Sequence, residues 1–336
     1  MNPTNVLVLG DGGWGTALAI HASGRGHSVR LWSHDPEYAA LLERTRRNPK
    51  FLPGVEIPRS VEISSDFRRL AEAAGLVLSV VPTQFLRRVL GKLEGGIPPG
   101  ADIVSCTKGI ERETLQLPSQ ILAGRIGPRP VTILSGPSHA EEVARGLPAS
   151  VVVASRDPAA ARRVLEVLSG PTFRIYTSPD PLGVEVAGAV KNVIAVAAGI
   201  ADGLGLGDNA QAALITRGVA EIARLGVSLG GRRETFLGLA GIGDLIVTCT
   251  SRHSRNRMVG FRIGSGETLD VILRSTEKVP EGVETTRSLV ELSRRSGVDM
   301  PIAREVHAVL FEDRQPLDAV HNLMTRTAKD EFAEPA

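Results

Sequence analysis

The chain has 336 residues, a length that favours two domains because a domain usually spans roughly 100–200 residues. Hydrophobic residues make up 42%, and 39 basic against 37 acidic residues leave a formal net charge of only +2. This near balance argues against a nucleic-acid-binding protein, which usually shows a clear basic excess. Cys106 and Cys249 lie outside any metal or redox spacing, and the N-terminus lacks a signal-peptide pattern. We therefore expect a cytoplasmic protein without a metal site.

Short β-rich runs alternate with helical patterns in the first half of the chain. The expected strands are Val6–Gly10, Ser28–Trp32, Leu76–Val81, Ile103–Cys106, Val131–Leu134, Ser150–Ala154 and Phe173–Tyr176. Helical spacing lies between most of them, for example in Ala17–Ser23, Glu37–Arg46 and Ala159–Leu168. This alternation predicts a Rossmann-like, doubly wound and mostly parallel sheet. Asn48–Pro58 contains three prolines and is expected to form a loop inserted into the pattern.

The pattern changes near Ser178, where two prolines in three residues predict a hinge. Long helical patterns follow, at Leu182–Ala201, Asn209–Leu229, Arg255–Ile263, Thr285–Ser296 and Ile302–Phe311. We expect a first domain over residues 1–178 and an all-helical C-terminal domain over residues 179–336. The apolar run Val186–Ala201 contains Lys191 and is shorter than the roughly 20 residues that a membrane span needs, so it predicts a buried helix.

A glycine-rich turn follows the first expected strand and opens a helix. Residues 10–15 read GDGGWG, which fits the pattern GxGxxG. In this pattern Gly10 permits the tight turn, Gly12 lets the backbone approach a pyrophosphate, and Gly15 lets the helix pack closely. The pattern alone is weak, but both flanking elements are present, so we predict a dinucleotide site at the helix N-terminus. Trp14 either packs in the core or contacts the cofactor.

The end of the second expected strand bears on which dinucleotide is bound. An acid about 20 residues after the glycines would bind the ribose 2′-hydroxyl of NAD. This strand instead ends in Trp32-Ser33-His34, and Asp35 with Pro36 is typical of a helix start. Because Ser33 and His34 can accept a 2′-phosphate, we expect the chain to use NADP, and NAD as well.

Lys191 is the most informative single residue. A lone cation in an apolar helix must find a partner, reach solvent or have its pKa depressed. Because its neighbours are too apolar for a solvated face, we favour a functional lysine, which can donate the proton that accompanies hydride addition to a carbonyl. Asp244 follows a glycine-rich turn, and either caps the next helix or contacts a substrate hydroxyl or Lys191.

Two strand ends carry further candidate ligands. Lys108 follows an expected strand, at the end that faces the ligand crevice in doubly wound sheets. Gly136 and Ser138 follow the next strand, where amides and a hydroxyl can bind an anion or substrate oxygens. A plain capping turn fits Gly136 and Ser138 nearly as well, and a surface lysine is the alternative for Lys108.

The strongest local cluster of positive charge runs from Ser251 to Arg257. Ser254 is expected to cap a helix that opens with Arg255 and Asn256. A helix N-terminus with Ser, Arg and Asn side chains suits a phosphate group. A solvated basic face is the alternative, and nucleic-acid contact is disfavoured by the near-neutral charge and by an aromatic content of only 4%.

Taken together, these segments resemble the bacterial-type NAD(P)-dependent glycerol-3-phosphate dehydrogenase family. The matching runs follow the family's order over almost the whole chain: Gly10–Ala17 (GDGGWGTA), Thr107–Ile110 (TKGI), Leu134–Ala140 (LSGPSHA), Gly188–Ile194 (GAVKNVI), Ala240–Leu245 (AGIGDL), Ser254–Arg257 (SRNR) and Val279–Gly282 (VPEG). There are two departures. Gly13 stands where the family often has serine or alanine, and Pro280 stands where another residue is often found.

The resemblance implies reduction of dihydroxyacetone phosphate to sn-glycerol 3-phosphate and the reverse, with Lys191 as general acid/base and a product that feeds phospholipid synthesis. It implies that the substrate is held by Lys108, Gly136, Ser138, Lys191, Asp244, Ser254, Arg255 and Asn256. It implies that the dinucleotide contacts Gly13, Trp14, His34, Lys108, Ala140, Arg255, Val279 and Glu281, in addition to the loop glycines Gly10, Gly12 and Gly15.

Two alternatives compete with this interpretation. A related β-hydroxyacid dehydrogenase would combine the same kinds of domain but bind a carboxylate, and phosphate competition would distinguish it. A non-catalytic dinucleotide sensor is the second alternative, and Lys191 together with the Ser254–Asn256 cluster argues against it. We expect a small phosphorylated substrate, neither a nucleic-acid partner nor a membrane span, and leave a homodimer open.

Overall fold

The computed structural model describes residues 3–93, 95–127, 129–276, 280–328 and 330–331. The chain divides into two compact units. The first comprises Met1–Lys108 with Gln116–Glu185, and the second comprises Gly109–Leu115 with Val186–Ala336. The division falls inside helix α8 (Pro181–Gly203), slightly after the boundary expected at Ser178.

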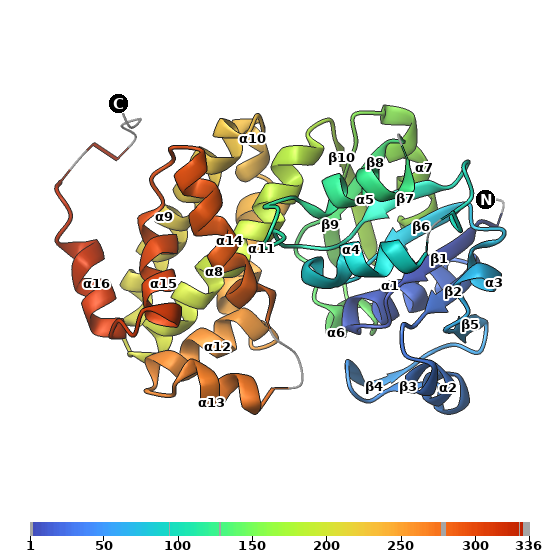
Figure 1. Ribbon diagram of the computed structural model, residues 1–336, viewed down its shortest axis with the longest axis horizontal. Helices are drawn as coiled ribbons and strands as arrows, with labels where there is room; N and C mark the ends of the chain where they lie inside the picture. The colour runs from blue at the N-terminus through green and yellow to red at the C-terminus, as the bar shows by residue number, and fades with distance from the viewer. Residues whose placement is uncertain (1–2, 94, 128, 277–279, 329, 332–336) are drawn as a thin grey trace. The chain divides into compact units, whose positions relative to one another are not determined.

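In its described part, the first unit is built on an eight-stranded sheet with the order β10-β9-β8-β7-β6-β1-β2-β5 (Figure 1). Its strands are β1 (Asn5–Leu9), β2 (Ser28–Trp32), β5 (Val61–Ser64), β6 (Leu76–Ser79), β7 (Asp102–Ser105), β8 (Val131–Ser135), β9 (Ala149–Ala154) and β10 (Phe173–Ser178). Neighbouring strands are parallel except β8 and β9, which are antiparallel. The predicted Rossmann-like, mostly parallel sheet is confirmed.

Both faces of this sheet are buried, as expected for central strands with continuous apolar runs. Successive side chains of β1 point to opposite faces, so Val6 and Val8 join one hydrophobic core while Leu7 and Leu9 join the other. The helices of this unit are α1 (Gly13–Gly24), α2 (Pro36–Thr45), α3 (Phe67–Ala71), α4 (Thr83–Lys92), α5 (Pro118–Ile126), α6 (Ala140–Val143) and α7 (Pro158–Leu168). Residues of α1 and α7 line the first core, and residues of α3, α4 and α5 line the second.

The expected loop over Asn48–Pro58 is wrong in one respect. It contains most of a two-stranded antiparallel hairpin of β3 (Arg47–Asn48) and β4 (Leu52–Glu56). Pro53 lies within β4, which is tolerated because β4 pairs with β3 alone and its other edge needs no ladder hydrogen bond. The hairpin is irregular and short, so the sequence shows no alternating pattern that would have predicted it.

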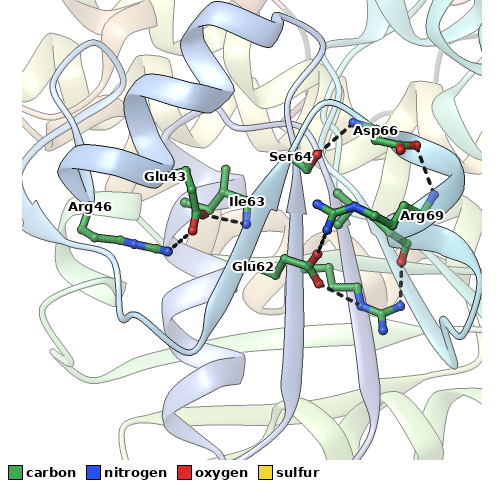
Figure 2. Close-up of polar contacts among 9 residues, drawn as sticks. Glu43, Arg46, Glu62, Ile63, Ser64, Asp66 and Arg69 are labelled. Atoms are coloured by element: carbon green, nitrogen blue, oxygen red, sulfur yellow. Dashed lines mark hydrogen bonds and ion pairs between the residues drawn. The ribbon is translucent and has the colours of Figure 1, made fainter.

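Strand β5 was also not predicted, and it forms one edge of the main sheet. Side chains from outside the sheet bind its backbone, as Figure 2 shows in part. Glu43 of α2 accepts a hydrogen bond of 3.1 Å from the Ile63 amide and forms an ion pair with Arg46. Arg46 in turn donates to the Val61 carbonyl at 2.7 Å. These contacts occupy backbone groups that an exposed edge strand would otherwise offer to another chain.

The described part of the second unit is helical, as predicted. Its helices are α9 (Gly207–Ser228), α10 (Arg233–Phe236), α11 (Asp244–Thr250), α12 (Arg255–Gly264), α13 (Leu269–Arg274), α14 (Glu281–Arg295), α15 (Pro301–Phe311) and α16 (Pro316–Met324), together with the larger part of α8. A π-helical turn, Leu239–Gly243, precedes α11. Helix α8 is long and apolar enough to cross a membrane, but its most apolar stretch is completely buried within the protein, as expected for a core helix.

Glycines bring α8 and α12 unusually close together. Added Cβ atoms would lie 2.0 Å from the Arg257 carbonyl oxygen at Gly199 and 2.0 Å from the Val196 carbonyl oxygen at Gly260. The same is true one turn along each helix, at Gly203 and Gly264, with distances of 2.2 and 2.4 Å to backbone oxygens. The two backbones therefore touch where side chains would normally separate helices by 8–10 Å.

Candidate functional site

The glycine turn between β1 and α1 has the geometry that a dinucleotide loop requires. Gly10 has a φ of +114°, a conformation that other residues rarely adopt. A Cβ at Gly15 would lie 1.9 Å from the Gly10 carbonyl oxygen, so only glycine lets α1 pack against the turn. A Cβ at Gly12 would meet no atom within 4 Å. The space beside Gly12 is therefore open, and the conformational roles predicted for Gly10 and Gly15 fit the structure.

The hairpin explains why Gly13 is a glycine in this chain. A Cβ at this position would lie 2.6 Å from the Phe51 carbonyl oxygen, between β3 and β4, so serine or alanine would require this backbone to move. The same Cβ would lie 3.7 Å from the Cβ of Ala140, which places Ala140 beside the loop. Trp14 is half-buried against the core, with its ring 6.5 Å from that of Phe173.

The structure changes the interpretation of Ser33. This side chain is fully buried, and its hydroxyl donates to Asp11 Oδ2 at 2.7 Å, so it is not open to a 2′-phosphate as expected. The physical reason is that the second residue of the glycine loop is an acid that reaches the end of β2. Burial raises the pKa of the Asp11 carboxyl, and the Ser33 hydrogen bond partly offsets this. His34, next in the chain, is exposed, and Asp35 caps α2 as predicted.

The two candidate segments at the ends of β7 and β8 come together. Lys108 Nζ donates to the Gly136 carbonyl at 3.2 Å, and the Ser138 hydroxyl donates to the same oxygen at 3.0 Å. Gly136 has a φ of +138°, and a Cβ there would lie 3.0 Å from the Val151 Cα. The three residues, predicted from two separate motifs, therefore form one polar group at the carboxyl ends of neighbouring strands, where doubly wound sheets bind ligands.

Lys191 has the partner that its apolar surroundings demanded. Its ammonium group donates to Asp244 Oδ1 at 2.5 Å and to the Thr248 hydroxyl at 2.8 Å. All three residues are buried, with Lys191 only 6% exposed and Asp244 only 1%. The Thr248 hydroxyl donates in turn to the Asp244 carbonyl at 2.6 Å. Of the roles left open for Asp244, the contact with Lys191 is the one that the structure shows.

The helix N-terminus predicted to bind a phosphate lies close to the same part of α8. Ser254 caps α12 by accepting a hydrogen bond from the Arg257 amide at 3.2 Å, and Arg255 is exposed. The Asn256 side chain donates to Asn192 Oδ1 at 2.9 Å and accepts from the Gly282 amide at 3.0 Å. This amide chain links the start of α12 to α8, directly beside Lys191.

Two polar side chains of this group were not singled out as site residues from the sequence. Thr248 lies one helical turn after Asp244 on α11, and that spacing was the available signal. Asn192 directly follows Lys191 but reaches the start of α12, which no local pattern indicates. Of the remaining candidates, Glu281 is half-buried as the first residue of α14, and Val279 lies outside the described residues.

The candidate residues thus form a dinucleotide loop in the first unit and a Lys191 cluster in the second. The dinucleotide loop is residues 10–15 with their contacts Ser33 and Asn48. The Lys191 cluster is Lys191, Asn192, Asp244, Thr248, Ser254 and Asn256. Among the described residues, no group of three or more His, Cys, Asp or Glu side chains is arranged to hold a metal ion.

Comparison with known proteins relates these groups to a family. Residues 5–161 match the family model described as NAD-dependent glycerol-3-phosphate dehydrogenase N-terminus, and residues 180–321 match the corresponding C-terminus. The chain is 47% identical over 99% of its length to glycerol-3-phosphate dehydrogenase (NAD(P)+) 2 of Salinibacter ruber, covering 97% of that protein. It is 49% identical over 96% of its length to the Moorella thermoacetica glycerol-3-phosphate dehydrogenase (NAD(P)+), covering 96% of that protein.

A solved structure agrees over both units. The crystal structure of glycerol-3-phosphate dehydrogenase from Coxiella burnetii superposes with a TM-score of 0.93, at 37% identity, covering 96% of this chain and 99% of that one. The D-mandelate dehydrogenase structure, at 14% identity and a TM-score of 0.63, shares the fold alone. The family match therefore outweighs the alternative of a β-hydroxyacid dehydrogenase. The chain belongs to the NAD-dependent glycerol-3-phosphate dehydrogenase family and is an NAD(P)-dependent oxidoreductase.

Proposed function

We propose that this chain interconverts dihydroxyacetone phosphate and sn-glycerol 3-phosphate, with Lys191 as the general acid and base. The observation that carries the proposal is the Lys191 ammonium group, buried in an apolar helix and held by Asp244 and Thr248. A buried cation is costly unless it is paired, and a group held in this way suits a developing negative charge on a carbonyl oxygen.

In the reduction, Lys191 donates a proton to the carbonyl oxygen as the carbonyl carbon receives hydride, and the ketone becomes a secondary alcohol. In the reverse direction, neutral Lys191 accepts that proton. Asp244 forms an ion pair with Lys191, which stabilises the ammonium form. The proton is therefore available for transfer to the substrate oxygen. Thr248 is hydrogen-bonded both to Lys191 and to the Asp244 backbone, so it restricts the position of the ammonium group.

The dinucleotide loop supports binding of the cofactor. The open side of Gly12 and the N-terminus of α1 would hold the pyrophosphate, with Gly10, Gly13, Trp14 and Gly15 shaping the loop around it. We further assign cofactor contacts to His34, Lys108, Ala140, Arg255, Val279 and Glu281, by the family resemblance. The bound nicotinamide supplies the hydride in one direction and accepts it in the other.

The start of α12 supports binding of the substrate phosphate. The Ser254 hydroxyl already binds the Arg257 amide, which leaves the backbone amides of Arg255 and Asn256 as the orphan donors of the first turn. The exposed Arg255 guanidinium adds a charged donor there. Lys108, Gly136 and Ser138 are further proposed contacts of the substrate. Binding energy from the remote phosphate can position the reacting carbonyl beside Lys191.

We also propose, from the family resemblance, that the enzyme works in the cytoplasm as a homodimer and supplies glycerol 3-phosphate for phospholipid synthesis. The burial of α8 inside the helical unit supports a protein without a membrane span. Light scattering on the purified protein tests the dimer. Depletion of the protein in its host should cause a growth defect that added glycerol 3-phosphate relieves, and growth without the supplement would contradict the lipid role.

The decisive experiment is a spectrophotometric assay of dihydroxyacetone phosphate with NADH and with NADPH. We expect oxidation of the reduced nicotinamide to depend on the phosphorylated ketone. Inorganic phosphate should compete with the substrate, and β-hydroxy acids should not be oxidised. Intact dinucleotide binding with no turnover of the phosphorylated ketone would contradict the proposal and would support a sensor.

A further inference from the structure

Strand β2 ends without the acid that NAD-selective Rossmann domains place there. In such domains an Asp or Glu at this point hydrogen-bonds the ribose 2′-hydroxyl of NAD. Here the strand ends at Trp32, and the next residues are Ser33 and His34. A carboxylate is nevertheless present at this point. It comes from Asp11 in the dinucleotide loop, whose Oδ2 accepts a 2.7 Å hydrogen bond from the Ser33 hydroxyl.

Asp11 is held in this position from several sides. Its backbone carbonyl accepts hydrogen bonds from the Asn48 side chain at 2.8 Å and from the Thr16 hydroxyl at 3.3 Å. The Ser33 hydroxyl, which binds the carboxylate, itself accepts a hydrogen bond of 3.3 Å from the Asp35 amide. Asp11, Ser33 and Asn48 are all buried, at 6%, 0% and 1% exposure. The carboxylate is therefore a fixed feature of the loop.

We propose that Asp11 selects the cofactor, by accepting a hydrogen bond from the ribose 2′-hydroxyl of NADH and by disfavouring the 2′-phosphate of NADPH. The acid that other domains place at the end of β2 is thus supplied by the glycine loop. Ser33 occupies Oδ2, so Oδ1 is the oxygen that we assign to the ribose 2′-hydroxyl. The inference deepens the proposed function and rests on it. It also reverses the preference for NADP that the missing strand-end acid suggested.

Charge is the physical basis of the discrimination. A 2′-phosphate carries up to two negative charges, and like charges in a partly buried site repel each other strongly because solvent screens them weakly. Ser33 cannot turn its hydroxyl to a phosphate without breaking its hydrogen bond to the buried Asp11 carboxylate. The exposed His34 is the nearby group that would favour a phosphate, and Asp35 is a second acid beside it.

The test compares Asp11→Asn with the wild type, because asparagine keeps the shape and the acceptor for Ser33 but removes the charge. Dissociation constants for NADH and NADPH are measured by isothermal titration calorimetry without substrate, and kcat/KM is measured for both with dihydroxyacetone phosphate. We expect the wild type to favour NADH at least about tenfold, and Asp11→Asn to reduce that ratio by about tenfold or more, a factor worth ~1.4 kcal/mol.

Two further variants keep the result interpretable. Asp35→Asn removes an exposed, solvent-screened charge next to Ser33 while keeping the cap of α2, and it should change the NADH to NADPH ratio much less than Asp11→Asn does. Ser33→Ala removes the hydroxyl but keeps the carboxylate, and it should retain a preference for NADH. A wild type that binds NADPH more tightly, or an unchanged ratio in Asp11→Asn, would overturn the inference. Because binding is measured without substrate, absence of turnover would contradict the proposed function alone.

Discussion

The dinucleotide loop and the Lys191 cluster present different kinds of binding group. The loop presents backbone amides and an open space beside Gly12, from residues contiguous in the sequence. The cluster presents side chains from α8 and from the more distant segment that holds α11 and α12. The glycine contact at Gly199 and Gly260 lets α8 and α12 touch. The binding proposed for the loop is therefore a property of one turn, whereas the chemistry proposed for the cluster depends on how closely helices pack.

The largest expected effect is that of Lys191→Met, which should separate chemistry from cofactor binding. Methionine fits the apolar helix without charge, and general acid catalysis contributes typically about 10²–10⁴-fold, so turnover should fall by at least that range. NADH binding by the loop should be unchanged. The control is Lys92→Met, on an exposed part of α4, and it should retain full turnover. Near-normal activity of the purified Lys191 variant would remove this lysine from the mechanism.

The next expected effect concerns Glu221 of α9, a fully buried carboxylate that accepts a 2.8 Å hydrogen bond from the Ile302 amide. Burial raises its pKa from 4.5 to about 7. The folded state therefore holds this proton more tightly than the unfolded state, so the group's contribution to stability is complete below pH 4.5 and is lost as pH rises through 7. At about 1.4 kcal/mol per pKa unit, the loss approaches roughly 3 kcal/mol.

Glu221→Gln should remove this contribution, because glutamine keeps the acceptor for Ile302 and does not titrate. The free energy of unfolding is measured by urea at pH 5 and pH 8 for both proteins, and its fall between the two should be smaller in the variant. Glu234→Gln changes an exposed acid of the same unit and should leave the fall unaltered. An identical fall in Glu221→Gln and the wild type would show that Glu221 is already ionised at pH 5.

Arg255 tests whether the start of α12 clamps the phosphate. Removing a charge-assisted hydrogen bond costs about 1.5–3 kcal/mol, so Arg255→Ala should lower kcat/KM for dihydroxyacetone phosphate about tenfold to hundredfold. Arg255→Lys should lower it less, because lysine keeps the charge but not the planar fork. Arg252→Ala, at an exposed residue just before the helix, is the matched control.

The unphosphorylated ketone decides the meaning of that result. Wild type should use dihydroxyacetone poorly, and Arg255→Ala should affect it much less than the phosphorylated substrate. Both are compared at saturating cofactor, since Arg255 is also a proposed cofactor contact. An equal loss for both ketones would mean that Arg255 serves the cofactor or the fold, and the phosphate site would have to be sought elsewhere.

The smallest expected effects come from substitutions of two glycines of the loop. One should weaken cofactor binding, and the other should lower the stability of the fold. Gly12→Ala places a methyl group in open space, so stability should be unchanged while NADH binding weakens about tenfold, or ~1.4 kcal/mol. Gly15→Ala places it against the Gly10 carbonyl, so the fold itself should lose about 1–3 kcal/mol. Thermal unfolding without ligand and titration with NADH measure the two effects. Equal thermal stability of both variants would contradict this division of roles.

What could be predicted from the sequence follows the same contrast. The other seven strands of the main sheet besides β5, the glycine loop and the Ser254 cap were predictable because each depends on neighbouring residues. Strand β5 and the β3–β4 hairpin were not, since they are short and depend on partners elsewhere. The need of Lys191 for a polar partner was visible from its apolar surroundings, but its contact with Thr248 was not, because helix packing decides it.

The role of Ser33 shows a second kind of limit. Its position after β2 was predicted correctly, and its hydroxyl was expected to face a phosphate. The outcome depended on Asp11, at a position of the glycine motif that the pattern leaves unspecified. A motif defines the residues that it requires, and the variable positions between them can still determine what the neighbouring strand end offers.

The glycine contact between α8 and α12 also determines which mutations the helical unit can tolerate. In an ordinary helix pair, a larger side chain can often be accommodated by a change of rotamer. At Gly199 and Gly260 the neighbouring atoms are backbone, so an added methyl group must displace a whole helix. That displacement would stretch the hydrogen bond between Asn192 and Asn256. We therefore expect few substitutions to be tolerated at these two positions, because a larger residue would disturb both the helix packing and the proposed active site. Neither glycine bears a functional group itself.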